Sequence, residues 1–160
     1  MFAGSIRENI TFGESRDSFD EETVDMAISL SQAKEFVDKI EGGKDHHIVQ
    51  LGKNVSGGQK QRLSIARALA RKPEILIFDD SFSALDYKTD ATLRHGLAKE
   101  LSDTTKIIVA QRVSTIRDAD KIIVLERGEA VGIGTHDELM ESCPVYREIA
   151  QSQLTAAELA

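Results

Sequence analysis

The spacing of apolar residues changes near the middle of the chain. In the first half, apolar residues recur at helical spacing and predict helices from about Asp20, over Ala33–Ile40, and from Ser56 or Gly57 to about Arg71. The short run Asn9–Gly13 predicts an extended segment instead. The first half is therefore expected to be mainly helical.

Short apolar runs replace this periodicity after Pro73. Ile75–Phe78 is typical of a strand that is buried on both faces of a parallel sheet. The other predicted elements are a helix over Lys88–Leu101, strands at Lys106–Ala110, Lys121–Glu126 and Ala130–Ile133, a turn at Arg127-Gly128, and two C-terminal helices. This alternation indicates an α/β fold with a mostly parallel sheet.

Composition limits the classes of function. A chain of 160 residues with 29% charged and 41% hydrophobic residues is typical of one soluble globular domain. The net charge of −7 argues against a nucleic-acid partner. Basic residues alternate with apolar ones between Lys60 and Lys72, which favours the solvated face of a helix over a DNA-binding arm.

The sequence supports neither a membrane-spanning protein nor a disulfide-stabilised one. No apolar run is long enough to cross a bilayer, so we expect no direct membrane insertion and any membrane association through a partner. Cys143 is the single cysteine, which excludes an intrachain disulfide.

Ser56-Gly57-Gly58 opens a predicted helix with residues that suit an anion. Free backbone N–H groups and the positive end of the helix dipole face outward there, and glycines let a phosphate approach closely. The alternative is a plain serine cap followed by a flexible glycine pair. In isolation this alternative is the stronger of the two.

Asp79 and Asp80 follow the predicted strand Ile75–Phe78. Carboxylates at the end of a buried strand suit Mg²⁺, which takes one or two of them together with phosphate oxygens. Asp80 is also placed to orient or activate a water molecule. The alternative is a pair of acids that closes the strand and caps the next turn.

Further motifs decide between these alternatives. With them, the chain resembles the nucleotide-binding domain of an exporter of the ATP-binding cassette (ABC) family. The segments that carry the resemblance are the signature sequence Val55–Gln59, the Walker B strand Ile75–Asp79, the D-loop Ser83–Asp86, the switch region Ala110–Ile116, and the opening Phe2–Ile10. They stand in the order that the family has and cover nearly the whole chain.

The resemblance implies the fold and the ligands. It implies the C-terminal part of a RecA-like P-loop NTPase core over residues 73–160, preceded by the helical signature subdomain over residues 1–72. ATP and Mg²⁺ are the implied cofactors, with Asp79 as the metal residue. The implied nucleotide-binding residues are Val55, Ser56, Gly57, Gly58, Gln59 and Asp86.

The chain departs from the family in its phosphate-binding loop. Neither Gly43-Lys44 nor Gly52-Lys53 has the first glycine or the following Ser or Thr of a Walker A motif. The Q-loop glutamine and the adenine-stacking aromatic residue are also missing. The chain therefore resembles the latter part of a cassette, and we expect it to be inactive alone.

Two other departures concern catalytic positions. Asp80 stands where the family has a catalytic glutamate, and Gln111 stands where it has the switch histidine. Aspartate is one methylene shorter, and glutamine cannot carry a proton or a positive charge. Asp80 and Gln111 together resemble the degenerate half of a heterodimeric exporter.

The family's assembly implies the partners. Cassettes of this family pair head to tail, so the signature residues would complete ATP held by a second cassette, and transmembrane domains would hold both at the cytoplasmic side of the membrane. Gln50 falls where exporters carry a glutamate that senses these domains, although an ordinary surface glutamine is equally compatible. Alternative functions are a truncated, non-catalytic chain that offers only its signature motif, or a soluble ABC ATPase of DNA maintenance.

Overall fold

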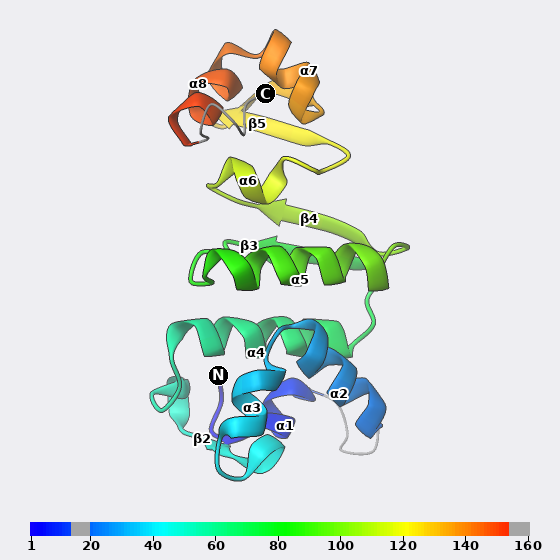
Figure 1. The fold of residues 1–160 in the computed structure, drawn as a ribbon, viewed down its shortest axis with the longest axis vertical. Helices are drawn as coiled ribbons and strands as arrows, with labels where there is room; N and C mark the ends of the chain where they lie inside the picture. The colour runs from blue at the N-terminus through cyan, green and yellow to red at the C-terminus, as the bar shows by residue number, and fades with distance from the viewer. Residues whose placement is uncertain (14–19, 154–160) are drawn as a thin grey trace. The chain divides into compact units, whose positions relative to one another are not determined.

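The structure is a computed structural model that describes residues 1–13 and 20–153 of the chain. Its contacts divide the chain into two compact units, Met1–Ile107 and Ile108–Ala160. Helices and strands follow one another along the chain as in Figure 1. The observed mixture confirms the α/β class, whereas the expected boundary of the signature subdomain after residue 72 stays a prediction.

The first unit is mostly helical, as predicted. Its α-helices are α1 (Ile6–Ile10), α2 (Glu21–Leu30), α3 (Lys34–Lys39), α4 (Gly57–Ala70) and α5 (Tyr87–Glu100). Shorter elements are the 3₁₀ turns η2 (Gly43–Asp45) and η3 (Gln50–Gly52) and the antiparallel strands β1 (Gly4–Ser5) and β2 (His47–Ile48). Helix α4 packs against α1 and α2 and so forms the centre of this part (Figure 1).

Helix α1 contradicts the extended segment predicted at Asn9–Gly13. The Ser5 hydroxyl accepts a hydrogen bond from the Glu8 amide at 3.0 Å, and the Glu8 carboxylate accepts one from the Ser5 amide at 2.8 Å. This capping box starts a helix that buries Ile6 and Ile10 one turn apart. The prediction was wrong because it weighed the β-forming residues and overlooked the cap before them.

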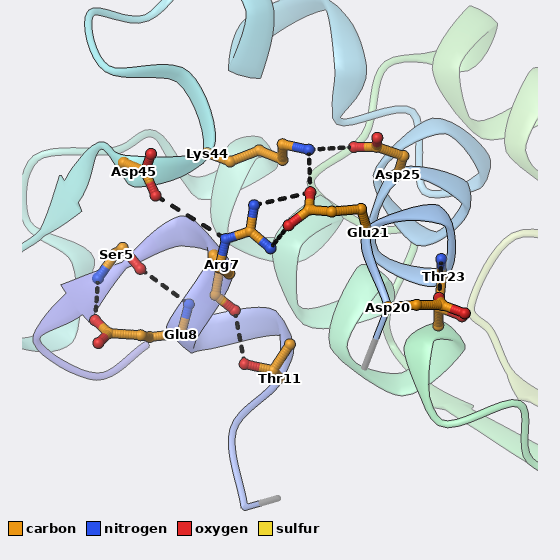
Figure 2. Close-up of polar contacts among 10 residues, drawn as sticks. All are labelled: Ser5, Arg7, Glu8, Thr11, Asp20, Glu21, Thr23, Asp25, Lys44 and Asp45. Carbon is orange, nitrogen blue, oxygen red and sulfur yellow. Dashed lines mark hydrogen bonds and ion pairs between the residues drawn. The ribbon is translucent and has the colours of Figure 1, made fainter. Parts of the chain in front are cut away.

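Ion pairs join the start of α2 to α1 and η2 (Figure 2). Glu21 contacts the guanidinium of Arg7 and accepts a hydrogen bond from the ammonium of Lys44 at 2.8 Å. Lys44 also donates to Asp25 at 2.7 Å, one turn further along α2. These contacts fix the ends of three elements that are distant in sequence.

The arginines of α4 are packed, so the predicted solvated face is wrong for Arg62 and Arg67. Arg67 donates to the backbone carbonyl of Asn9 at 2.6 Å, and its guanidinium lies 5.2 Å from the ring centroid of Phe2. Burial lowers the pKa of Arg67. Arg62 lies over the ring of Phe36. The reason is that the long stems of these side chains cover apolar surface that the α4 helix buries against its neighbours.

Strands β3 (Ile75–Asp79) and β4 (Thr105–Val109) are neighbours in a two-stranded sheet. Leu76 and Phe78 of β3 are buried, whereas Ile75 and Ile77 are 58% and 68% exposed. The prediction that this strand is buried on both faces is therefore wrong for the described chain. Its alternate residues point to opposite faces, and the part of the chain that the structure describes covers one of them.

The second unit is built on an antiparallel hairpin. Its elements are α6 (Val113–Ile116), β5 (Ile122–Glu126), β6 (Glu129–Gly134), α7 (His136–Ser142) and α8 (Pro144–Gln153). Arg127 and Gly128 join β5 to β6 with φ angles of 51° and 87°, as a two-residue hairpin turn requires. The predicted turn and the two C-terminal helices are confirmed.

The core of the second unit lies between one face of the hairpin and its helices. It consists of Val113, Ile122, Val124, Leu139, Cys143, Tyr146 and Ala150. An added Cβ at Gly132 would lie 2.8 Å from the Cys143 sulfur, so glycine allows this close approach of β6 to the helical layer. His136 and Tyr146 share a buried hydrogen bond of 2.8 Å at its edge.

Candidate functional site

The start of α4 is closed by a capping box. The Ser56 hydroxyl accepts from the Gln59 amide at 3.3 Å, and the Gln59 side-chain oxygen accepts from the Ser56 amide at 2.8 Å. These two bonds hold the first turn while the helix dipole still points its positive end outward. Ser56 and Gly57 are exposed, and an added Cβ at Gly57 would meet no atom within 4 Å. The helix start is therefore ordered and open above Gly57.

The loop before α4 is held by Asn54. Its side-chain amide donates to the carbonyl of His47 at 2.8 Å and accepts from the amide of Val49 at 3.1 Å. Val55 is 8% exposed, so this residue anchors the segment in the core. Gln50 and Leu51 lie in between, and Leu51 has a φ of 63° and is 64% exposed. The helix start thus follows a braced loop with an exposed apolar tip.

The predicted carboxylates stand at the end of β3. Asp79 is its last residue, Asp80 follows with a φ of 49°, and both residues are exposed. The described residues contain no group of three or more His, Cys, Asp and Glu that would surround a metal ion. Asp79 and Asp80 fit the donor set of a Mg²⁺ that takes most of its remaining ligands from phosphate and water.

Asp86 stands at the start of α5 and caps it. Its carboxylate accepts from the amide of Thr89 at 3.0 Å and from the hydroxyl of Thr89 at 2.7 Å. These hydrogen bonds, that of the Thr89 hydroxyl above all, lower the pKa of Asp86. Asp86 is therefore an exposed, ionised carboxylate whose orientation is set by the helix that follows.

Sequence reasoning missed Gln61, a residue that connects the start of α4 with the loop that carries Asp80. The side chain of Gln61, in α4, hydrogen-bonds with Asp80, Ser83 and Ala84 in the loop after β3. The structure therefore brings the signature helix and the carboxylate loop together within the first unit. A polar residue at the edge of the buried face of α4 was the one available signal, and it was too weak to single out Gln61.

Gln111 belongs to the second unit. Its side chain is exposed, while its backbone carbonyl accepts from the amide nitrogen of Gln153 at 2.9 Å. The oxygen of the same Gln153 side chain accepts from the Val113 amide at 2.9 Å. Gln153 thereby fixes the backbone around Gln111 and leaves the Gln111 side chain accessible.

Comparison with known proteins identifies the family. The sequence profile of the family described as "ABC transporter" matches residues 3–83, which include the start of α4 and the end of β3. The chain belongs to the ABC transporter family. The computed structure is also similar to that of a bacterial Atm1-family ABC exporter with ATP bound, with a TM-score of 0.91 and 35% identity over 97% of this chain and 27% of the other.

Several relatives of this ABC chain are known by sequence. It is 44% identical to an ABC transporter ATP-binding protein of Bacillus subtilis and 42% identical to one of Mycoplasma genitalium, in both cases over 96% of this chain and 26% of the relative. It is 37% identical to a multidrug resistance ABC transporter ATP-binding and permease protein of Lactococcus lactis, over 99% of this chain and 27% of the relative. The chain therefore spans about a quarter of these relatives. None of the helices that the structure describes is long and apolar enough to span a membrane.

Proposed function

We propose that this chain supplies the signature half of an ATP site in an ABC exporter. The observation that carries the proposal is the ordered start of α4, with Ser56 and Gly57 exposed and open space above Gly57. Outward N–H groups and a positive dipole end favour a phosphate at this position. Ser56, Gly57, Gly58 and Gln59 contact the phosphates of ATP held by a second cassette, Val55 anchors them, and Asp86 lies beside the same interface.

Asp79, Asp80 and Gln111 serve the other ATP site in this proposal. Mg²⁺ bound with ATP would neutralise charge on the phosphates during their transfer. The exposed carboxylate of Asp79 is the ligand that this chain offers to the ion. Asp80 and Gln111 replace a glutamate and a histidine of the family, so this site turns over slowly. The chain thus corresponds to the degenerate half of a heterodimer.

Transmembrane domains complete the proposed assembly. The exposed tip at Leu51 offers them an apolar contact beside Gln50. The relatives are described as ABC transporter proteins, and the one from Lactococcus lactis combines ATP-binding and permease parts. This favours an exporter over a soluble ATPase of DNA maintenance. We place the chain at the cytoplasmic side of the membrane, with residues 1–72 as the signature subdomain and residues 73–160 as the core remainder.

Gly57→Glu in the assembled transporter tests the proposal. A carboxylate in the open space above the helix start would repel phosphate, and we expect ATP hydrolysis and transport to fall at least about tenfold. Because an added Cβ at Gly57 meets no atom within 4 Å and the position is exposed, folding is expected to persist. Ala98→Glu, at an exposed position in α5, is the matched control. Equal activity of the two variants would refute the assignment of the helix start to ATP.

A further inference from the structure

One glutamine side chain holds both ends of the loop that follows β3. Gln61 Nε2 donates to the Asp80 carbonyl at 3.2 Å and lies 3.4 Å from the Ser83 hydroxyl. Gln61 Oε1 accepts from the Ala84 amide at 3.1 Å. Gln61 itself is half-buried in the second turn of α4, and its three contacts with the loop lie at the surface.

The first turn of α4 approaches the same loop. An added Cβ at Gly58 would lie 3.1 Å from the Ala84 carbonyl oxygen, which is closer than side chains ordinarily pack. The absence of a side chain at Gly58 therefore lets the backbone at Ala84 come close to α4, and Gln61, three residues further along the helix, hydrogen-bonds to the Ala84 amide. Ala84 is thus contacted on both sides of its backbone: its carbonyl oxygen lies close to Gly58 in the first turn of α4, and its amide donates to Gln61 in the second turn.

Asp80 has a backbone conformation that needs support. Its φ of 49° lies in the left-handed region, which the backbone of L-residues other than glycine rarely adopts. Its carbonyl accepts from Gln61 and from the Ser83 hydroxyl, the latter at 3.0 Å. Since the backbone angles of a residue set the direction of its side chain, the groups that hold this carbonyl also aim the Asp80 carboxylate.

We propose that Gln61 is a positioning residue that keeps Asp80 in its left-handed conformation and ties the Asp80–Ala84 loop to the start of α4. In terms of the proposed function, on which this step rests, Ser56–Gln59 and Asp80 serve two different ATP sites. Gln61 then joins those two sites inside one chain. A displacement of the signature helix by nucleotide is passed through the Gln61 side chain to the direction of the Asp80 carboxylate.

Backbone NMR of the 160-residue chain tests this role without nucleotide. In Gln61→Met, hydrogen exchange of the Ala84 amide is expected to rise about tenfold, as for the loss of one hydrogen bond, and the Asp80 Cα chemical shift to leave its left-handed value. In Gln61→Glu, the carboxylate still accepts from the Ala84 amide but cannot donate to the Asp80 carbonyl. This variant is expected to keep slow exchange at Ala84 and to change the shift of Asp80 alone.

Lys88→Met is the control, because it places the same side chain at an exposed position of α5. Unchanged exchange and shifts in Gln61→Met, or the same changes in the control, would overturn the proposal. So would identical behaviour of the Met and Glu variants, since a purely structural role of Gln61 predicts no separation of its donor and acceptor. Because ATP is absent throughout, a negative result with Gly57→Glu in the transporter would count against the proposed function and leave this test unaffected.

Discussion

Glu21 shows how much one side chain depends on its neighbours. Hydrogen bonds from Arg7 and then from Lys44 lower its pKa from an ordinary value of 4.5 to about 2. The carboxylate is exposed, so solvent and salt screen these ion pairs and their contribution is modest. Glu21 nevertheless contacts both Arg7 of α1 and Lys44 of η2, and Asp25 of α2 adds a second ion pair to Lys44 (Figure 2).

Glu21→Gln is expected to destabilise the first unit at pH 6 and to matter progressively less in acid. Because the folded-state pKa is depressed, the stabilisation is fully present above 4.5 and is lost as the pH falls from 4.5 towards 2. Urea unfolding at a series of pH values measures the difference between wild type and variant. Glu22→Gln, in the same helical turn, controls for the helix dipole. A difference that does not change across this pH range would contradict the assignment.

In the proposed function, Asp80 and Gln111 replace the catalytic glutamate and the switch histidine of the family, and they account for slow ATP turnover. In the assembled transporter, Asp80→Glu combined with Gln111→His is expected to raise ATP turnover roughly tenfold, because it restores the reach of the base and a group that can carry a proton. Both positions are exposed. Asp103→Glu, in an exposed turn, is the control, and turnover equal to that of wild type would count against the role of the pair.

Helix starts are the best-specified elements of this chain. Helices α1, α4 and α7 all begin with a capping box, formed by Ser5 with Glu8, Ser56 with Gln59 and Thr135 with Glu138. Each cap contributes about 1 kcal/mol of helix stability. The same device therefore starts a structural helix at Ser5 and the candidate ATP contact at Ser56. A cap alone does not distinguish structure from function.

The strands of this chain bury only one of their two apolar faces. On β3, β4, β5 and β6, apolar residues also occupy the face opposite the core and are about half to two-thirds exposed: Ile75, Ile77, Ile107, Val109, Ile123, Leu125, Val131 and Ile133, which range from 42% to 68%. Rows of this kind promote association between sheets or chains.

The purified chain is therefore expected to self-associate. Replacing Ile77 and Ile123 together by threonine, which keeps β-branching but adds a hydroxyl, should shift the chain towards monomer in sedimentation experiments at micromolar concentration. Ile149→Thr changes an apolar residue of α8 that is 39% exposed and serves as the control. An equal degree of association in all three proteins would show that the strand faces are not responsible.

At the scale of the whole molecule, the proposed function gives the chain parts of two ATP sites. Its sequence contains a signature motif and a Walker B strand but no Walker A loop. The relatives from Bacillus subtilis and Mycoplasma genitalium are about four times as long, since the chain spans 26% of each. Neither of its half-sites can cradle the phosphates of a nucleotide by itself.

The isolated 160-residue chain is thus expected to bind ATP weakly and not to hydrolyse it. Phosphate release measured with the purified chain should equal that of its Asp79→Ala variant, which removes the proposed Mg²⁺ ligand. Hydrolysis above that of the variant would mean that another segment of the chain replaces the Walker A loop.

Some of this molecule was predictable from local pattern. The helix after Asp20, the helix after Ser56 and the turn at Arg127-Gly128 were predicted correctly, because caps, periodicity and turn residues act over a few neighbouring positions. The exposed face of β3 and the packed arginines Arg62 and Arg67 were not, because both depend on which distant segment lies opposite.

The sequence by itself determined the family, since the signature, Walker B, D-loop and switch segments are short motifs whose chemistry and order are local properties. It also determined where the candidate ATP residues stand along the chain. Only the tertiary structure decided that Gln61 bridges α4 and the loop after Asp80, and that Asp80 is held left-handed there. The physical reason is that a hydrogen bond between residues about twenty positions apart depends on how α4 lies beside the loop after β3, which no local pattern encodes.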